Sequence, residues 1–283
     1  MNAKTDTLIY PGENGVIYSV KLNTNFDESK GSLSLNLNNK IKFKYTTKRS
    51  NSSTYWLGIE SSLVALGEYI IVADNCGDLL CINANTFKVA WAQDVKDDTN
   101  CSPVLEFDKS GKPYIYISTS LHWTASDGKG AIPIWKINAE NGEIVWETSY
   151  NCHTVSGLSG GVQGTIALGK NNLSNLIFVP VSRTPLRDQG LLVALDKRTG
   201  KEIWKFQTSM YSWSSPVDIY DENGNGYIIH CDTGGNMYLL DGLSGKVLNK
   251  IQLNGIIEAS PAIYNGKIVV GTRAQKIYGI DLL

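Results

Sequence analysis

Short apolar runs alternate with turn residues along the whole chain. The clearest example is G-L-L-V-A-L-D-K-R-T-G-K-E-I-W at residues 190–204, in which residues 191–195 are apolar enough for a buried strand. Asp196 can hydrogen-bond its own backbone and Gly200 can adopt a positive φ, so a tight turn is expected after that strand. Beyond Gly200 polar and apolar positions alternate, and Trp204 falls on the apolar face. The pattern predicts a β-hairpin with one buried face.

The same hairpin recurs through the sequence. Its turn position falls at residues 21, 83, 138, 196, 241 and 281, so successive copies lie between 40 and 62 residues apart. The tryptophan recurs as Trp91 and Trp146, whereas the copy that contains Asp241 and Gly245 has Asn249 in its place. A Ser-Pro pair precedes the hairpin at residues 102, 215 and 260. Two motifs that repeat in one phase predict a propeller or a repeat array.

These repeats predict an all-β fold, a β-propeller of four-stranded antiparallel blades. We expect a single domain over residues 1–283, with about six repeat units at 7–47, 59–95, 102–150, 161–208, 215–253 and 260–283. The third unit contains a longer loop at residues 121–131. The first unit lacks its inner strand and the last its outer strand, so the two ends do not complete each other. The sequence fits a six-bladed ring with imperfect closure or a larger ring with more blades before Met1, and we favour the second.

The residues that define the repeat are expected to be structural. The tryptophans should pack between blades, and the Asp and Gly residues should form the turns. The residues in question are Trp91, Trp146, Trp204, Asp196, Gly200, Asp241 and Gly245.

The composition narrows the possible functions. A content of 42% hydrophobic and 19% charged residues is typical of a globular protein. The net charge of −1 gives no attraction for nucleic acid, and no apolar run is long enough for a membrane span, so we expect neither. The five cysteines are an odd number without a Cys-x-x-Cys pair. They are therefore expected to be isolated reduced thiols, not a disulfide framework or a zinc site.

The hairpin at 190–204 resembles the repeat of the quinoprotein-like (PQQ-binding-like) β-propellers, as do the segments at 214–217, 235–238 and 266–273. The likeness covers nearly the whole chain and is strongest to uncharacterised members from low-GC anaerobic bacteria. It implies the quinoprotein alcohol dehydrogenase-like superfamily and, among its dehydrogenases, PQQ with calcium, a catalytic Asp and an adjacent cysteine pair. No two cysteines are adjacent here, so that disulfide ring cannot form. We expect no cofactor, with PQQ and calcium as the alternative.

One segment matches the start of a calcium-binding loop. Asp221, Asn223 and Asn225 occupy the first ligand positions of D-x-N-x-N-G, and Asp232 stands at position twelve. Residues 227–231 are predicted to form a strand, which would carry Asp232 to the other end of the blade. A plain turn explains the same residues, and both interpretations stay open.

The strand order of a blade predicts a binding face. Loops between strands two and three leave from the same end as loops that lead to the next blade. This end collects three loop tryptophans together with polar and charged side chains: Trp56, Asn75, Trp123, His153, Arg183, Arg187, Trp213, Asp232, Glu258 and Arg273. Aromatic faces beside planar hydrogen-bonding groups suit sugars, peptides or an aromatic cofactor. The alternative is that long loops fold over their own blades.

The sequence favours a non-catalytic binding or scaffolding propeller that presents this face to a polymer or protein partner. We expect a protein or carbohydrate ligand at the channel mouth and an extracytoplasmic or cell-surface location. No catalytic residue is assigned. The alternatives are a PQQ-dependent or other cofactor-bearing oxidoreductase and a structural segment of a longer cell-surface protein.

Overall fold

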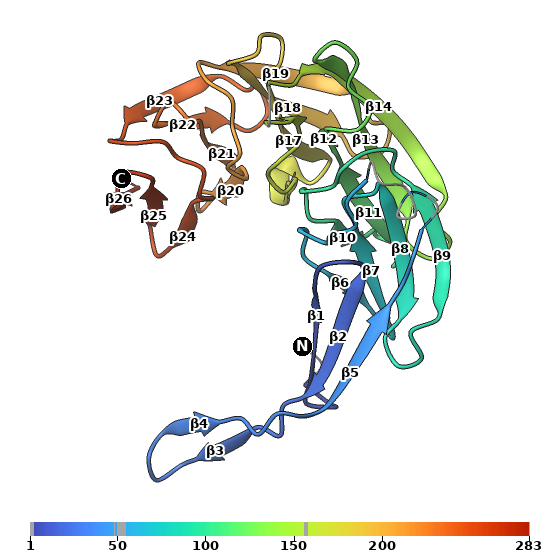
Figure 1. Cartoon of the computed structure of the whole chain (residues 1–283). Helices are drawn as coiled ribbons and strands as arrows, with labels where there is room; N and C mark the ends of the chain where they lie inside the picture. Colours follow the sequence, from blue (N-terminus) through green and yellow to red (C-terminus); the bar gives the residue numbers. More distant parts are fainter. Residues whose placement is uncertain (1–2, 48, 50–54, 156–157, 283) are drawn as a thin grey trace.

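The chain folds into a succession of antiparallel sheets. The computed structural model describes residues 3–47, 49, 55–155 and 158–282. The sheets stand side by side along an open arc, as blades do in a propeller (Figure 1). The predicted all-β propeller of antiparallel blades is confirmed.

Three blades have four strands that pair in chain order. Blade 2 consists of β6 (Val64–Leu66), β7 (Tyr69–Ala73), β8 (Asp78–Asn83) and β9 (Val89–Asp94). Blade 3 consists of β10 (Val104–Phe107), β11 (Pro113–Ser118), β13 (Lys129–Asn138) and β14 (Ile144–His153). Blade 5 consists of β20 (Val217–Tyr220), β21 (Gly226–Cys231), β22 (Asn236–Asp241) and β23 (Val247–Gln252). The two end blades have three strands each, namely β1 (Thr7–Pro11), β2 (Val16–Lys21) and β5 (Asn38–Lys44) in blade 1, and β24 (Ala262–Tyr264), β25 (Lys267–Thr272) and β26 (Lys276–Asp281) in blade 6. A hairpin of β3 (Asn25–Asp27) and β4 (Ser32–Ser34) projects from blade 1 (Figure 1).

Blade 4 is built partly from its neighbour. Its main strands are β17 (Leu176–Ser182), β18 (Gly190–Asp196) and β19 (Glu202–Thr208), with β15 (Gly160–Gly161), β16 (Ala167–Leu168) and the short 3-10 helix η2 (Asn171–Leu173) before them. β12 (Ser120–Leu121), which follows blade 3's β11, pairs with β15 and so joins this sheet. The prediction of a loop throughout residues 121–131 is therefore wrong at both ends. Leu121 belongs to β12, and β13 already begins at Lys129 because its pairing with β14 extends to His153.

The apolar core is divided into layers between neighbouring blades. Between blades 2 and 3, for example, Ile71 and Leu79 of blade 2 pack with Ile115 and Trp135 of blade 3. Each of the five buried clusters combines residues from two successive blades in this way. A blade between two others therefore buries one face against the preceding blade and the other face against the following blade. An isolated hairpin has no such neighbours and cannot bury its apolar face.

The repeated tryptophan joins each of three blades to the next. Trp146 of blade 3 and Trp204 of blade 4 are each only 8% exposed, and their Nε1 atoms donate to the carbonyls of Lys197 and Gly242, at 3.0 Å in both cases. Trp91 of blade 2 donates to the carbonyl of Ala139 at 3.1 Å. All three acceptors follow directly after the turn position of the next blade, so the contact repeats with the sequence.

The turn glycine is needed for this tryptophan contact. Gly200 has φ +71°, and a Cβ atom there would lie 2.6 Å from Cε3 of Trp146. Gly245 stands in the same relation to Trp204, at 2.5 Å. The residue must therefore be glycine for two reasons, the left-handed backbone and the indole ring that lies against it.

The Ser-Pro serines make a second link between blades. The Ser102 hydroxyl accepts the backbone N–H of Ser62 at 3.0 Å, and the Ser260 hydroxyl accepts that of Ser215 at 3.0 Å. The Ser215 hydroxyl itself accepts the N–H of Thr165 at 2.9 Å. Each serine thus satisfies a backbone donor of the preceding blade, which explains why this motif repeats in phase with the hairpin.

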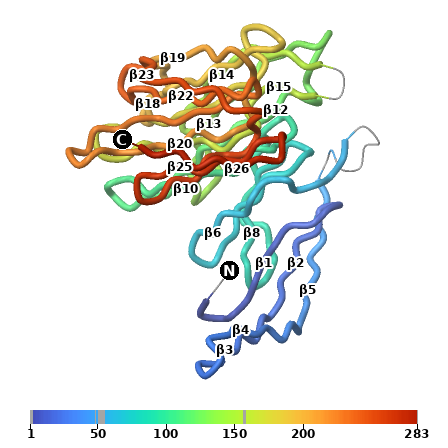
Figure 2. The backbone as a smooth tube through the Cα atoms, turned by 90° about the vertical axis from the view of Figure 1, so that its left-hand side faces the viewer, coloured from blue at the N-terminus to red at the C-terminus, as the bar shows by residue number. Residues whose placement is uncertain are grey.

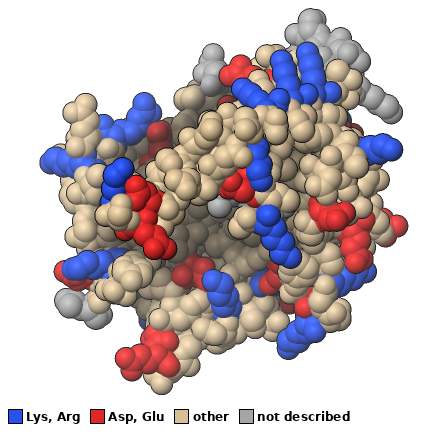
Figure 3. All heavy atoms as spheres, turned by 90° about the horizontal axis from the view of Figure 1, so that it is seen from below, with Lys and Arg blue, Asp and Glu red and all other residues tan. Residues whose placement is uncertain are grey.

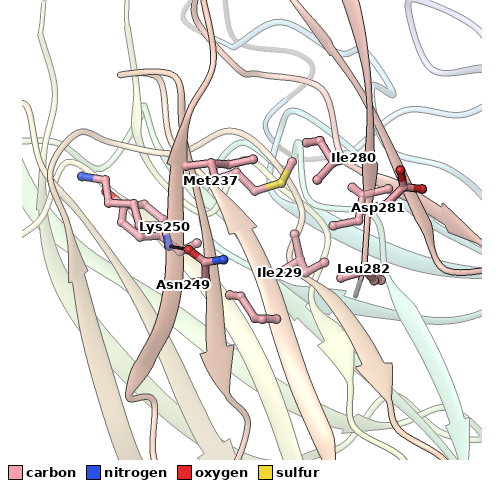
Figure 4. A pocket seen from close by; sticks show the side chains of 11 residues that line it. Ile229, Met237, Asn249, Lys250, Ile280, Asp281 and Leu282 are labelled. Carbon is pink, nitrogen blue, oxygen red and sulfur yellow. Dashed lines mark hydrogen bonds between the residues drawn. The ribbon is translucent and has the colours of Figure 1, made fainter.

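Two junctions depart from the tryptophan–glycine contact. Blade 2 has Phe87 at the glycine position with φ +56°, and Phe43 of blade 1 stacks on it with ring centroids 5.2 Å apart. Between blades 5 and 6, Asn249 replaces the tryptophan, and its Oδ1 accepts the N–H of Lys250. A mainly aliphatic hollow of about 70 Å³ lies at this junction (Figure 4). Its labelled lining residues are Ile229, Met237, Asn249, Lys250, Ile280, Asp281 and Leu282.

The arc does not close. No strand pairing joins blade 1 to blade 6 within the described ranges, and the two end blades are separated in both views (Figures 1 and 2). Seen from below, acidic and basic side chains are interspersed around a deep hollow (Figure 3). No helix in the described part of the chain is long and apolar enough to cross a membrane.

Candidate functional site

The three loop tryptophans line one hollow. Trp56 precedes blade 2, Trp123 follows β12, and Trp213 lies between blades 4 and 5, yet all three border a space of about 490 Å³. The strand order predicted this convergence on one end of the blades. The rest of the lining is mostly polar: Glu60, Asn75, Asp98, Asn100, His122, Leu158, Ser159 and Gln163.

Asp97 fixes the loop that carries Trp123. Its carboxylate is buried and accepts the backbone N–H groups of Trp123 (2.8 Å) and Thr124 (3.0 Å) and the Thr124 hydroxyl (2.5 Å). The Trp123 Nε1 atom donates to the carbonyl of Asn75 at 2.6 Å. Tyr55 lies against the same indole, with ring centroids 5.1 Å apart. Trp123 is therefore held in place by contacts within the chain.

Asn75 connects two carboxylates at the edge of the hollow. Its Nδ2 atom donates to Glu60 Oε2 at 2.9 Å and to Asp98 Oδ1 at 2.5 Å. Asp98 also accepts the Ser120 hydroxyl at 2.7 Å and the Asn100 amide at 3.1 Å. Burial raises the pKa of Asp98, while the hydrogen bonds from Ser120 and Asn75 act in the opposite direction.

Gly58 makes room for two of the lining side chains. A Cβ atom at this position would lie 2.5 Å from Cη2 of Trp56 and 2.8 Å from Oδ1 of Asn75. The Trp56 ring and the Asn75 amide therefore both lie against the backbone of Gly58, where a side chain would collide with them. Trp56 is 42% exposed, so one of its surfaces is available to a ligand.

Two buried polar atoms of residues in this lining have no hydrogen-bond partner among the described residues. Asn75 is only 1% exposed, and its Oδ1 atom accepts no hydrogen bond. Trp213 Nε1 is buried and makes no hydrogen bond. One atom is an acceptor and the other a donor, and both are covered by the protein, so neither is presented to the space of the hollow.

The structure brings together four of the predicted binding residues, Trp56, Asn75, Trp123 and Trp213, and not the other six. Arg183 folds back, with its guanidinium 2.7 Å from the carbonyl of the exposed Arg187 and over the ring of Tyr211. The His153 ring lies 3.2 Å from the Arg183 carbonyl. None of these three residues borders the hollow.

The remaining predicted residues have local partners. Asp232 is fully buried, and its carboxylate accepts the Asn236 amide at 2.8 Å and the Tyr238 hydroxyl at 2.9 Å. Arg273 and Glu258 form an exposed ion pair at 3.2 Å in blade 6 and the loop before it. These contacts are made with neighbouring residues of the same blade or of the loop beside it, and none of the three side chains borders the hollow.

The calcium-like segment forms a hydrogen-bonded turn. Asp221 accepts the backbone N–H of Asn223 at 2.9 Å and both the backbone and side-chain N–H of Asn225, at 2.8 and 2.9 Å. β21 carries Asp232 to the opposite end of the blade, as predicted. Within the described ranges, no group of three or more His, Cys, Asp or Glu residues is placed to hold a metal ion.

Sequence reasoning missed Glu60, Asp98 and Asn100 as lining residues. Asp98 and Asn100 lie in the connection between blades 2 and 3, which the strand-order rule places at the same end as the tryptophans. Applying that rule to every connection, and not only to aromatic and charged loops, would have found them.

The comparisons with known proteins agree with this architecture. Residues 188–283 match the PQQ-like repeat family model described as "Outer membrane protein assembly factor BamB". This match covers about a third of the chain, from the end of blade 4 through blade 6, and the β-propeller fold extends over the other blades as well. The particular likeness to low-GC bacterial members stays a prediction.

Three similarities illustrate the range of relatives. The chain is similar in structure to BamB from Moraxella catarrhalis (TM-score 0.54, 15% identity), over 79% of this chain and 58% of that one. It is similar to a quinohemoprotein alcohol dehydrogenase from Pseudomonas putida (TM-score 0.60, 14% identity), over 90% of this chain and 42% of that one. It is 27% identical to the beta-alanine-activating enzyme of Homo sapiens over 82 residues, which are 28% of this chain and 8% of that enzyme. The chain spans only part of each of these proteins, and the two structural similarities concern the fold alone.

Proposed function

We propose that this propeller is a non-catalytic binding module whose ligand occupies the hollow between Trp56, Trp123 and Trp213. The observation that carries the proposal is the convergence of three tryptophans from three separate loops on one space of about 490 Å³. Exposed aromatic surfaces with a few oriented polar groups are typical of binding sites. The structural likeness to BamB, which is described as an assembly factor, supports a binding role at an extracytoplasmic location.

The lining of the hollow does not suit PQQ. This quinone carries several carboxylates, whereas the described lining contains the acidic residues Glu60 and Asp98 and neither lysine nor arginine. Without its calcium ion, this anionic cofactor would meet like charges and no cationic lysine or arginine side chain in the described lining. The structural likeness to an alcohol dehydrogenase suggests an oxidoreductase as the alternative function. Because of the charge of the lining, we favour the binding function.

The proposal can be tested with purified protein on arrays of glycans and of peptides. We expect binding to at least one class, and at least a tenfold loss in Trp56→Ala and in Trp123→Ala. Tyr264→Ala is the matched control, because this aromatic residue is 79% exposed in blade 6 and does not border the hollow. Binding that survives both tryptophan substitutions would place the ligand elsewhere. A quinone absorbance shift on adding PQQ and calcium, together with alcohol oxidation, would instead support the enzyme.

A further inference from the structure

We infer that the hollow between Trp56, Trp123 and Trp213 binds an arginine side chain that projects from a protein partner. The inference rests on the proposed binding function and names its ligand class. It starts from the charge of the lining and from the accessible surface of Trp56.

The acidic side chains of the lining have no cationic partner within the described ranges. Glu60 and Asp98 border the hollow, and neither lysine nor arginine is among its described lining residues. None of the ion pairs formed by lysine or arginine in the described part of the chain involves either carboxylate. The protein therefore leaves the negative charge at this hollow without a matching positive charge.

The two carboxylates are bound to the same amide group. Asn75 Nδ2 lies 2.9 Å from Glu60 Oε2 and 2.5 Å from Asp98 Oδ1. Burial raises the pKa of Asp98, and the charge of Glu60 acts in the same direction. Hydrogen bonds from Ser120 and Asn75 and the ring of His122 oppose this change. Glu60 and Asp98 thus repel each other, and a cation in the hollow would be attracted to both.

Asn75 also lies beside two of the three tryptophans. Its backbone carbonyl accepts the Nε1–H of Trp123 at 2.6 Å. A Cβ atom on Gly58 would lie 2.8 Å from Asn75 Oδ1 and 2.5 Å from Cη2 of Trp56, so the amide and that ring are close together. Trp56 is 42% exposed, and Glu60 is exposed as well. An accessible indole and an accessible carboxylate are therefore gathered around one residue.

This combination selects a cation. The face of an indole ring is negative and attracts a cation placed over it. A carboxylate attracts the same cation and accepts its hydrogen bonds. An anionic group would be repelled by Glu60 and Asp98, and a neutral group would gain nothing from their charges.

The cation is an organic one. Among the described residues, no group of three or more His, Cys, Asp or Glu is placed to hold a metal ion. The hollow of about 490 Å³ has room for a polyatomic group. A contact of this kind already exists nearby, since the Arg183 guanidinium lies over the Tyr211 ring, 4.1 Å from its centroid. Tyr211 itself lies against Trp213, with ring centroids 5.9 Å apart.

Arginine fits this lining better than lysine does. Its guanidinium is planar and weakly hydrated, so it can stack on an indole while its N–H groups reach a carboxylate. Its apolar stem can lie along the tryptophan surface. Because Trp56 and Glu60 are exposed, a side chain that projects from another protein can reach both.

The test uses capped peptides in which glycine alternates with arginine, lysine, citrulline or glutamate, and spermidine as a free cation. Citrulline has nearly the shape of arginine but carries no charge. Binding is measured by calorimetry at pH 8, at which an ordinary imidazole is uncharged. We expect the arginine peptide to bind most tightly and the citrulline peptide to bind about tenfold more weakly.

Glu60→Gln is the sharpest variant. It removes the charge but keeps a side-chain oxygen that can accept the Asn75 amide. We expect about 3- to 5-fold weaker binding of the arginine peptide, with unchanged citrulline binding and an unchanged melting temperature. Glu68→Gln is the matched control, because Glu68 is exposed and does not border the hollow. Equal losses for both peptides would show that Glu60 only supports Asn75, and that result would overturn the inference.

Trp56→Leu tests the aromatic surface. Leucine keeps an apolar side chain but has no ring, so arginine binding should weaken about 3- to 5-fold. Tyr264→Leu, at an aromatic residue that is 79% exposed in blade 6, should leave the affinity unchanged. Equal affinities of the Trp56→Leu variant and the wild type would contradict the inference.

The outcomes separate the two proposals. If a glycan, the citrulline peptide or the glutamate peptide binds at least as tightly as the arginine peptide, and does so in a Trp56-dependent way, the inference fails while the binding function stands. If spermidine or the lysine peptide binds more tightly than the arginine peptide, the ligand is a different cation and the inference fails in the same way. If neither these probes nor the arrays show binding, both proposals fail.

Discussion

The junction between blades 4 and 5 and the junction between blades 5 and 6 are built from the same repeat but differ at the tryptophan position. In the first, Trp204 lies against Gly245 and donates to the Gly242 carbonyl. In the second, Asn249 turns back onto its own strand and a hollow of about 70 Å³ is left nearby. At each of the three junctions that have the tryptophan, the indole lies against a turn glycine of the following blade, namely Gly142, Gly200 or Gly245.

The junction between blades 1 and 2 supports the same rule. Phe87 occupies the glycine position, where a tryptophan from the preceding blade would collide with its side chain. Blade 1 instead supplies Phe43, which stacks on Phe87 at 5.2 Å. The two departures from the repeat compensate each other across the junction.

The largest expected effect is that of removing the tryptophan. Trp204→Ala should lower the free energy of unfolding by about 3–5 kcal/mol, because it empties a buried, hydrogen-bonded site. Asn249→Ala, at the equivalent position of blade 5, should change it by less than about 1 kcal/mol. Urea denaturation of both variants measures the difference. Equal losses would show that the two junctions are energetically alike, against the comparison.

The second prediction tests why the turn glycine is needed. Gly67→Ala should cost about 1–2 kcal/mol, because Gly67 has φ +56° but no atom lies within 4 Å of the new Cβ. Gly200→Ala should cost about 1–3 kcal/mol more, because its Cβ would also meet Trp146. Combining Gly200→Ala with Trp146→Ala should abolish that excess in a double-mutant cycle. An excess that persists would assign the cost to the backbone alone.

The third prediction concerns His230 of blade 5, which is fully buried and whose ring nitrogens have no hydrogen-bond partner in the described part of the chain. Burial lowers its pKa from 6.5 to about 3. The unfolded chain therefore binds a proton below pH 6.5 while the folded protein does not, so stability falls as the pH drops from 6.5 toward 3. Between pH 6.5 and 5 the loss should be about 2 kcal/mol.

His230→Leu should remove that pH-dependent loss, and His122→Gln, a change at an exposed histidine, should not. Denaturation curves recorded at a series of pH values provide the measurement. A wild-type slope that persists in His230→Leu would mean that another group is responsible.

The smallest expected effect concerns the serine links, which the two junctions share. Ser215→Ala and Ser260→Ala each remove the acceptor of one backbone N–H, from Thr165 and Ser215 respectively. Each should cost about 1 kcal/mol. Similar melting-temperature shifts for the two variants would show that the junctions differ only in their aromatic contact. A loss in Ser215→Ala alone would mean that the serine link also depends on the tryptophan.

The sequence could predict the repeat because single residues determine each of its features. The Asp196 turn, the Gly200 conformation and the Trp204 position follow from local chemistry and alternation. The convergence of Trp56, Trp123 and Trp213 followed from strand order, which sets the end of the blade from which a loop leaves.

Side-chain direction within those loops could not be predicted. Arg183 was expected at the binding face, but its backbone adopts φ +58° and its side chain returns to the Arg187 carbonyl. The Asn75 Nδ2 atom donates to Glu60 and Asp98, which come from different segments of the chain. Such contacts are set by the packing of several loops, and periodicity contains no information about them.

The division of the core into five layers has a consequence for how the chain unfolds. Each layer is shared by two successive blades, so cooperativity passes only between nearest neighbours, as in other repeat proteins. Within the described residues, blades 1 and 6 each share one layer, with blades 2 and 5 respectively, so in the 283-residue chain their amide hydrogens should exchange with solvent earliest. Blades 3 and 4 each have a described blade on both sides, and β12, which follows β11 of blade 3, pairs within the sheet of blade 4. The amide hydrogens of these two blades should therefore exchange with solvent most slowly.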